Sequence, residues 1–309
     1  MRAAAPGMRL TGITTVIDDS PVLHRLGLDV PAGEITVVMG PSGAGKTTVV
    51  RHLTGLLEPD RGTVEIGGRD VWGSGPDGLR EIRNGMGVLL GGSSLFDSSL
   101  FASLTAYENL DYVLKHHGFG EAEREQRAMA MLHDLALDGV ASSLPDAMPA
   151  HARRRLGLAR ALVADRPALI LDDIDVCLDA AHSPRILAAL AGWRERTQGT
   201  LLLTTHNIRL ARELGDHLAI LCNGRIITTG SAAELLNGID SNEDFDHRFR
   251  VSDFLGPPRM ADILADRERD RESRRGLQMT IDPMMVRAAI IGIVVVTLVV
   301  MTLTLAHLI

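Results

Sequence analysis

The chain has 309 residues, which is enough for one large or two modest domains with a substantial hydrophobic core. Its formal net charge of −7 argues against general binding of nucleic acids. The two cysteines, Cys177 and Cys222, lack the spacing of metal ligands and suit a protein of the reducing cytoplasm.

The sequence pattern of residues 8–236 predicts an α/β domain, because short apolar runs that end at turn residues alternate with helical segments. Such runs fit a mostly parallel sheet covered by helices. We expect residues 1–8 to form an irregular leader, residues 107–165 an inserted helical subdomain, and Asn223-Gly224 the turn of a β-hairpin. The expected strands are residues 35–39, 62–66, 87–90, 168–171, 201–205 and 217–222.

The first chemical motif directly follows the expected strand 35–39. Residues 40–47 read Gly-Pro-Ser-Gly-Ala-Gly-Lys-Thr and match G-x-x-x-x-G-K-[ST], a loop whose backbone amides surround nucleotide phosphates. We expect Lys46 to reach the β- and γ-phosphates and the Thr47 hydroxyl to bind Mg²⁺, with the N-terminus of the next helix adding positive partial charge. The residues expected to bind the nucleoside triphosphate are Gly40, Pro41, Ser42, Gly43, Ala44, Gly45, Lys46, Thr47 and Thr48.

The second motif lies at the end of the expected strand 168–171, which is followed by two carboxylates, Asp172 and Asp173. In nucleotidases with this phosphate loop, an Asp at the end of such a strand holds Mg²⁺, so we assign Asp172 to the metal and Asp173 to the attacking water. The strand 201–205 ends just before His206, which we expect to contact the γ-phosphate. The predicted site therefore has Asp173 and His206 as catalytic residues and Thr47 and Asp172 as metal ligands.

In this order and spacing the motifs resemble an ATP-binding-cassette (ABC) ATPase over about residues 10–236. The phrases Val-Pro-Ala-Gly-Glu at 30–34 and Leu-Gly-Leu-Ala-Arg-Ala-Leu at 156–162 fit the same family. The resemblance implies a P-loop NTPase (RecA-like) core with an inserted α-helical subdomain, ATP and Mg²⁺ as cofactors, and head-to-tail dimers on membrane permease subunits. Within the family, residues 94–97 and 104–110 are similar to the subgroup that powers Mce/Mla-type lipid transporters.

The chain departs from the family pattern at the signature sequence. ABC ATPases bind each ATP between the phosphate loop of one subunit and the Leu-Ser-Gly-Gly-Gln signature of the other. Here the aligned residues 148–152 read Met-Pro-Ala-His-Ala, so the serine hydroxyl and the flexible glycines are missing, and Pro149 lacks a backbone N–H. A similar phrase at residues 89–93, Leu-Leu-Gly-Gly-Ser, precedes the helical subdomain instead, and we reject it as the signature.

Further family positions also differ. The glutamine expected after strand 87–90 is Gly91, the catalytic glutamate is Asp173 followed by Ile174 in place of proline, and the aromatic residue that stacks on adenine falls near Ile17. Because Asp173 is one methylene shorter than glutamate, its reach changes by about 1.5 Å, and misplacement of that order can cost about 10²-fold in rate. We therefore expect a slow or single-site ATPase, with activity that is reduced or dependent on a partner cassette chain.

The C-terminal part differs in composition from the α/β domain. Residues 237–283 carry an acidic stretch and a charged run at 262–275, so we expect a charged linker. Residues 288–309 contain no Asp, Glu, Lys or Arg, and a helix over them would be roughly 33 Å long, so we expect a transmembrane helix at 284–309. Arginines precede this span, which places the ATPase domain on the cytoplasmic side of the plasma (inner) membrane, with a single-pass C-terminal anchor.

Three functions are compatible with these observations. The leading hypothesis is an energising or regulatory subunit of a membrane ABC transporter for lipid import, with permease subunits and a second cassette chain, identical or different, as partners. The second is a non-hydrolysing, ATP-sensing scaffold, which the degraded signature favours and the retained Asp173 and His206 oppose. The third is a soluble cassette ATPase of translation or DNA repair, which the expected span, the acidic charge and the lack of a second cassette disfavour.

Overall fold

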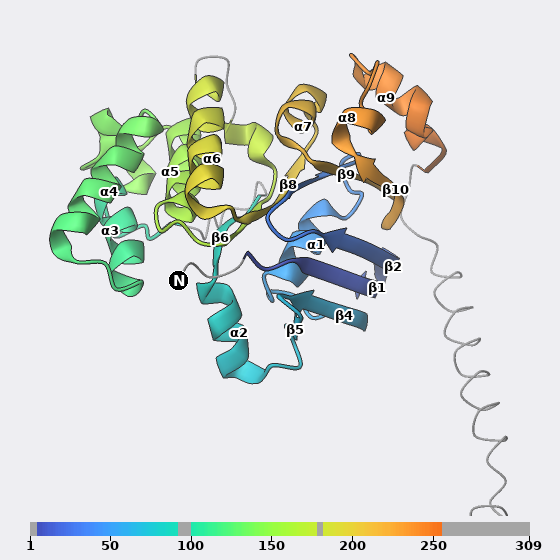
Figure 1. Ribbon diagram of the computed structural model, residues 1–309, viewed down its shortest axis with the longest axis horizontal. Coiled ribbons are helices and arrows are strands. Elements are labelled where there is room, and N and C mark those ends of the chain that lie inside the picture. The colour runs from blue at the N-terminus through green and yellow to red at the C-terminus, as the bar shows by residue number, and fades with distance from the viewer. Residues whose placement is uncertain (1–4, 92–99, 178–181, 255–309) are drawn as a thin grey trace, which may run out of the picture. The chain divides into compact units, whose positions relative to one another are not determined.

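The computed structural model describes residues 5–91, 100–177 and 182–254 (Figure 1). Of the expected charged linker only residues 237–254 are described, and the expected membrane span at 284–309 lies outside the described residues. Among the helices within the described ranges, none is both long enough and apolar enough to cross a bilayer.

A six-stranded sheet forms the centre of the fold, with the strand order β10-β9-β3-β8-β7-β6. Neighbouring strands run parallel from β9 to β6, and β10 is antiparallel to β9 across the Asn223-Gly224 turn. The α/β class, the hairpin and five of the expected strands are thus confirmed to within one residue at their ends. The strands are β3 (Ile35–Met39), β6 (Met86–Leu89), β7 (Ala168–Leu171), β8 (Thr200–Thr205), β9 (His217–Cys222) and β10 (Arg225–Ser231).

A second, antiparallel sheet with the order β2-β1-β4-β5 was mostly missed by the sequence prediction, and Figure 1 shows it as a separate layer. Strand β1 begins at Met8, so the expected irregular leader ends before that residue. The pairing of β1 with β2 and β4 shifts register at several points, and such bulges break the apolar–polar alternation that identifies a strand. The strands are β1 (Met8–Ile17), β2 (Ser20–Val30), β4 (Arg61–Ile66) and β5 (Arg69–Asp70).

Helices cover the central sheet and form the inserted block that was expected between residues 107 and 165. Helix α3 begins with a capping box, in which the Thr105 hydroxyl accepts from the Glu108 amide and the Glu108 carboxylate accepts from the Thr105 amide. One turn on, Asn109 is fully buried and its side-chain amide donates to the Phe101 carbonyl oxygen. The α-helices are α1 (Lys46–Leu53), α2 (Gly75–Asn84), α3 (Ala106–His116), α4 (Glu121–Asp134), α5 (Ala150–Leu162), α6 (Ser183–Thr197), α7 (Ile208–Leu214), α8 (Ala232–Leu235) and α9 (Asn242–Phe249).

Helix α9 lies within the segment that the sequence analysis treats as a charged linker. It too begins with a capping box, formed by Ser241 and Asp244, and its Phe245 is buried in the hydrophobic core. The acidic residues of this stretch therefore cap a helix. Their negative charges lie at its N-terminal end, where they interact favourably with the helix dipole.

The central sheet separates two hydrophobic clusters, because successive side chains of a strand point to opposite faces. In β3, Val37 packs into the cluster that includes α5 and α6, whereas Val38 packs into the cluster that includes the antiparallel sheet and α1. Both side chains are fully buried. Strand β3, which leads into the phosphate loop, is therefore packed against hydrophobic side chains on both faces of the sheet.

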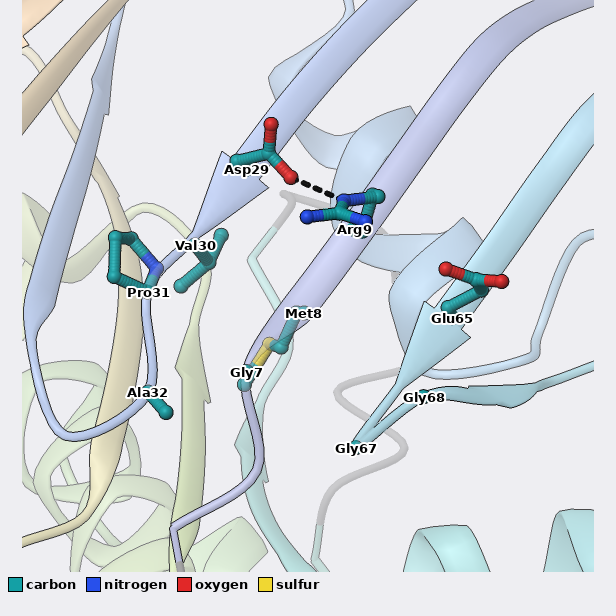
Figure 2. A pocket seen from close by; sticks show the side chains of 10 residues that line it. All are labelled: Gly7, Met8, Arg9, Asp29, Val30, Pro31, Ala32, Glu65, Gly67 and Gly68. Carbon is teal, nitrogen blue, oxygen red and sulfur yellow. Dashed lines mark hydrogen bonds and ion pairs between the residues drawn. The ribbon is translucent and has the colours of Figure 1, made fainter.

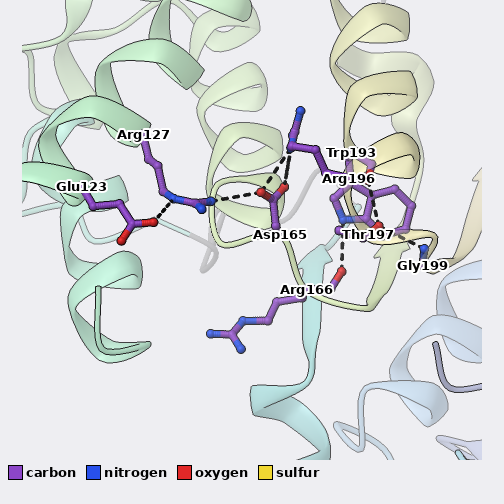
Figure 3. A network of polar contacts seen from close by, with 8 residues as sticks. All are labelled: Glu123, Arg127, Asp165, Arg166, Trp193, Arg196, Thr197 and Gly199. Atoms are coloured by element: carbon purple, nitrogen blue, oxygen red, sulfur yellow. Dashed lines mark hydrogen bonds and ion pairs between the residues drawn. The ribbon is translucent and has the colours of Figure 1, made fainter. Parts of the chain in front are cut away.

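Asp165 joins the helical block to the central sheet just before β7 (Figure 3). Its carboxylate accepts from Arg127 of α4 at 3.0 Å and from Arg196 of α6 at 3.1 Å. In the same region the indole N–H of Trp193, a fully buried side chain of α6, donates to the Arg166 carbonyl oxygen at 3.1 Å. These contacts hold α4 and α6 to the segment that enters β7, the strand that Asp172 directly follows.

Candidate nucleotide-binding site

The predicted site residues meet at one edge of the central sheet. Strands β3, β8 and β7 are parallel neighbours, with Met39 paired to Thr205 and Leu171 paired to Leu203. Since the carboxyl ends of parallel strands lie at the same edge, the phosphate loop, His206 and Asp172 follow adjacent strand ends. The spatial grouping of these three predicted elements is thus present in the fold.

Glycine is required at both ends of the phosphate loop. A Cβ atom on Gly40 would lie 1.9 Å from the Leu221 carbonyl oxygen, so no other residue fits at the end of β3 without moving β9. Gly45 has a φ of 106° and a Cβ there would lie 2.6 Å from a methyl carbon of Leu23. The chain then enters α1 at Lys46, with no acidic residue in the first turn, which leaves the positive end of the helix dipole free to attract an anion.

The Lys46 side chain is folded back against the phosphate loop. Its ammonium group is buried and donates to the carbonyl oxygens of Gly40 at 2.7 Å and Pro41 at 3.0 Å. Burial lowers the pKa of Lys46, and the nearby carboxylates of Asp173 and Asp172 oppose that shift. A phosphate group bound in the loop would add negative charge next to the Lys46 ammonium group and so stabilise its charged form.

Asp172 is the better placed of the two expected metal ligands. Its side chain is 1% exposed, and Oδ1 accepts from the Thr204 hydroxyl at 2.7 Å. Its Oδ2 is buried and has no hydrogen-bond partner within the part of the chain that the structure describes. A buried carboxylate oxygen without a partner is costly, and a divalent cation would satisfy it. Thr47, the other expected ligand, is half-buried in the first turn of α1.

Gly91 lies against both carboxylates, at the position where the family has glutamine. A Cβ atom there would lie 2.9 Å from Asp172 Oδ2 and 2.8 Å from the Asp173 Cβ atom. Any larger residue would therefore push on the predicted metal ligand and on the predicted catalytic carboxylate. With the Asp pair in this position, there is no room for a glutamine side chain at residue 91.

Asp173 has a left-handed backbone with a φ of 54°, which is unusual for a residue other than glycine. Its backbone amide donates to the Thr204 hydroxyl oxygen at 2.8 Å, so this hydroxyl contacts both members of the Asp pair. Ile174, which replaces the family proline, is fully buried in the core. The backbone turn is thus maintained by packing and by Thr204 rather than by a proline ring.

His206 follows β8 and is held by a residue that the sequence analysis missed. Asp175 accepts from the Thr205 hydroxyl at 2.5 Å and from the His206 backbone amide at 2.6 Å. Although His206 is exposed, desolvation of its imidazole by the surrounding groups and the positive charge of Lys46 lower its pKa. Asp175 could have been noticed as a third carboxylate shortly after β7, next to β8, the strand that His206 follows.

The residues at the signature position do not resemble a phosphate-binding surface. Met148 is 4% exposed and Pro149 occupies the N-cap position of α5 without a side-chain cap. The rejected phrase at residues 89–93 begins at the end of β6, and its last two residues lie outside the described ranges. Cys177 and Cys222 are buried and are not joined in a disulfide bond, and the described residues contain no cluster of three or more His, Cys, Asp or Glu side chains suited to a metal.

A pocket of about 400 Å³ lies elsewhere, at the start of β1, the end of β2 and the turn between β4 and β5 (Figure 2). Its most prominent polar feature is the ion pair between Arg9 and Asp29, whose side chains are 61% and 70% exposed. Such exposed pairs contribute little to stability. None of the predicted site residues lines this pocket.

The sequence of this chain is similar to those of known ATP-binding proteins of transporters. A family model described as "ABC transporter" matches residues 23–175. "Probable ribonucleotide transport ATP-binding protein mkl" from Mycobacterium leprae is 31% identical over 256 residues, which cover 82% of this chain and 72% of the relative. "Methionine import ATP-binding protein MetN" from Nocardia farcinica is 31% identical over 235 residues, which cover 75% of this chain and 69% of the relative.

The fold is also similar to solved structures of this family. A dimeric post-hydrolysis state of an ATP-binding cassette, bound to ADP and Pi, matches with a TM-score of 0.66 and 26% identity over 73% of this chain and 98% of that chain. The resemblance that the motifs suggest is therefore confirmed at the level of the family, its ATP-binding domain and its P-loop fold. This chain belongs to the ATP-binding proteins of ABC transporters.

Proposed function

We propose that this chain binds MgATP through its phosphate loop and Asp172, as the cassette subunit of a membrane transporter that imports lipids in the Mce/Mla manner. The observation that carries the nucleotide site is the buried, unpartnered Oδ2 of Asp172 beside a buried Lys46. The similarity of residues 104–110 to the lipid-transporter subgroup supports the substrate class. A relative named for methionine import supports the direction of transport.

Each residue of the proposed site has a task that its surroundings support. Lys46 would exchange its carbonyl contacts for β- and γ-phosphate oxygens, with the loop amides around them. Thr47 and Asp172 would hold Mg²⁺, which neutralises charge on the phosphate groups when bound. Asp173 would orient the attacking water, and His206 would donate a hydrogen bond to the γ-phosphate.

Hydrolysis at this site is proposed to be slow and to depend on a partner chain. The carboxylate of Asp173 is shorter than the family glutamate, and residues 148–152 lack the hydroxyl that contacts the opposite ATP. A partner cassette with an intact signature would complete the site at Lys46, whereas a second copy of this chain would not. The cassette of known structure that is bound to ADP and Pi is itself dimeric.

An ATP-holding scaffold is the second candidate function, and Pro149 at the position of the signature serine favours it. Proline has neither a hydroxyl nor a backbone N–H with which to contact a nucleotide on another subunit. In this case bound ATP would stabilise the dimer, and the partner chain would perform the hydrolysis. Asp173 would then have no catalytic task.

We also propose that residues 284–309 anchor the chain in the membrane, with the ATPase domain on its cytoplasmic face. The support is the composition of residues 288–309 and the arginines that precede them. Removal of residues 288–309 should release the protein from washed membranes. Retention of the shortened chain would point to a permease contact that holds it there.

Affinity purification of the full-length chain in mild detergent tests the transporter assignment. Permease subunits and a second cassette chain should co-purify, and the ATPase activity of the complex should fall when Asp173→Asn replaces the native chain. The same partners with unchanged activity would favour the ATP-holding function instead. A preparation without any permease subunit would contradict the transporter proposal.

A further inference from the structure

One carboxylate fixes the loop that carries His206. Asp175 lies in a 3-10 helix, Ile174–Cys177, directly after the Asp pair that follows β7. Its Oδ1 accepts from the Thr205 hydroxyl at 2.5 Å and its Oδ2 accepts from the His206 backbone amide at 2.6 Å. Each carboxylate oxygen therefore accepts a hydrogen bond, one from Thr205 and one from His206, at the end of β8.

The contact continues from Asp175 into the helix that follows. Thr205 is fully buried, and its hydroxyl oxygen also accepts from the Asn207 backbone amide at 3.0 Å. The Asn207 side chain in turn accepts from the Leu210 amide at 3.1 Å and caps the N-terminus of α7. The backbone is thus held on both sides of His206, although the imidazole itself is exposed.

Asp175 and its hydrogen bonds to Thr205 and His206, here called the anchor, belong to the nucleotide site and not only to the core. Asp175 and Asp173 both interact electrostatically with Lys46 and with His206. The loop 205–207 and the phosphate loop follow β8 and β3, whose final residues pair directly as Thr205 and Met39. A change in the loop backbone would therefore move the imidazole relative to the phosphate loop.

We propose that Asp175 is a positioning residue of the nucleotide site, which holds the loop 205–207 so that the His206 imidazole faces the γ-phosphate of bound ATP. The inference rests on the proposed nucleotide-binding function. Asp175 acts through His206 and makes no contact with the nucleotide itself. Its carboxylate charge suits this task, because hydrogen bonds to an ionised acceptor are shorter and stronger than neutral ones.

Amide hydrogen exchange of the full-length protein without nucleotide tests the anchor by itself. Asp175→Asn keeps the side-chain volume but leaves only one acceptor oxygen, so the amides of residues 205–207 should exchange about tenfold faster. Glu213→Gln is the matched control, because it removes the charge of an exposed carboxylate on α7 and should leave these rates unchanged. Equal rates in Asp175→Asn and the native chain would overturn the proposal.

Nucleotide affinity tests whether the anchor acts through His206. Asp175→Asn and His206→Ala should each weaken MgATP binding about fivefold to tenfold and MgADP binding less than twofold, since only ATP has a γ-phosphate. The double variant should bind MgATP no more weakly than His206→Ala alone. Additive losses, or equal losses for MgATP and MgADP, would contradict the positioning role.

The two experiments separate this inference from the function on which it rests. If the native chain binds neither nucleotide, the proposed function fails, while the exchange rates still decide whether Asp175 anchors the loop. If the native chain binds MgATP and Asp175→Asn binds it equally well, only the inference about Asp175 fails. Asp175→Ala removes both acceptor oxygens. It should therefore raise the amide exchange rates of residues 205–207 and weaken MgATP binding by more than Asp175→Asn does.

Discussion

The Thr204 hydroxyl links the carboxylate of Asp172 to the backbone of Asp173. It donates to Asp172 Oδ1 at 2.7 Å and accepts from the Asp173 backbone amide at 2.8 Å, and the side chain is fully buried. Thr204→Val keeps the volume and the β-branch but removes both hydrogen bonds. Because Asp172 Oδ2 already has no partner within the described residues, the variant would leave the whole carboxylate unsatisfied.

The cost follows from the two contacts. Loss of a hydrogen bond to an ionised group costs about 1.5–3 kcal/mol, and a buried amide without a partner adds about 1 kcal/mol or more. We therefore expect Thr204→Val to lower the free energy of unfolding by roughly 3 kcal/mol, which corresponds to a fall in Tm of about 6–12 °C for a domain of this size. Thr204→Ser keeps the hydroxyl and loses one buried methyl group, so it should cost only about 1 kcal/mol.

Thermal and urea unfolding of the full-length protein in mild detergent would measure both variants against the native chain. The expected order of stability is native, then Thr204→Ser, then Thr204→Val, with the larger step at the loss of the hydroxyl. If Thr204→Val were as stable as Thr204→Ser, the hydroxyl would not hold the Asp pair, and the described geometry of the site would be wrong.

Further predictions concern the loop, the helical block and the response to pH. Gly45→Ala should weaken MgATP binding more than Gly43→Ala, because both positions have positive φ but only at Gly45 would the Cβ atom clash, 2.6 Å from Leu23; equal losses in a titration would argue against the clash. Asp165→Asn should destabilise the protein by about 1 kcal/mol in low salt and by less in 1 M NaCl, because its ion pairs with Arg127 and Arg196 are partly exposed; a loss that does not depend on salt would show that charge is not its source. Burial and the nearby Arg166 lower the pKa of His117 from 6.5 to about 4, so the unfolded chain takes up a proton first and stability should fall as the pH drops through that window. His117→Gln should flatten this part of the unfolding profile, and a profile identical to that of the native chain would contradict the assignment.

The central sheet could be predicted from sequence because each strand is a short, uniformly buried apolar run that ends at a turn. Strands β3, β7 and β8 are buried at every residue, and the chemistry of the site follows directly at the ends of these strands. The antiparallel sheet could not be predicted in the same way. Its register shifts and its Asp18-Asp19 turn, with φ values of 48° and 58°, obscure the alternation that marks a strand.

The individual site residues were predictable where a motif places them and not where the fold brings them together. Lys46 and Asp172 belong to motifs with fixed spacing, and both lie at the expected edge of the sheet. Asp175 is thirty positions from Thr205 in the chain, and only the pairing of β7 with β8 brings the two into contact. The close approach of Gly91 to the Asp pair likewise depends on the packing of β6 against β7.

The proposed function requires above all that MgATP binds at the phosphate loop of this chain, and equilibrium binding to the full-length protein measures this. Lys46→Ala and Lys115→Ala form a matched pair, since these are the chain's two lysines and Lys115 is exposed on α3. Lys46→Ala should abolish MgATP binding, and Lys115→Ala should bind like the native chain. Undiminished affinity in Lys46→Ala would contradict the assignment of the phosphate loop and, with it, the proposed function.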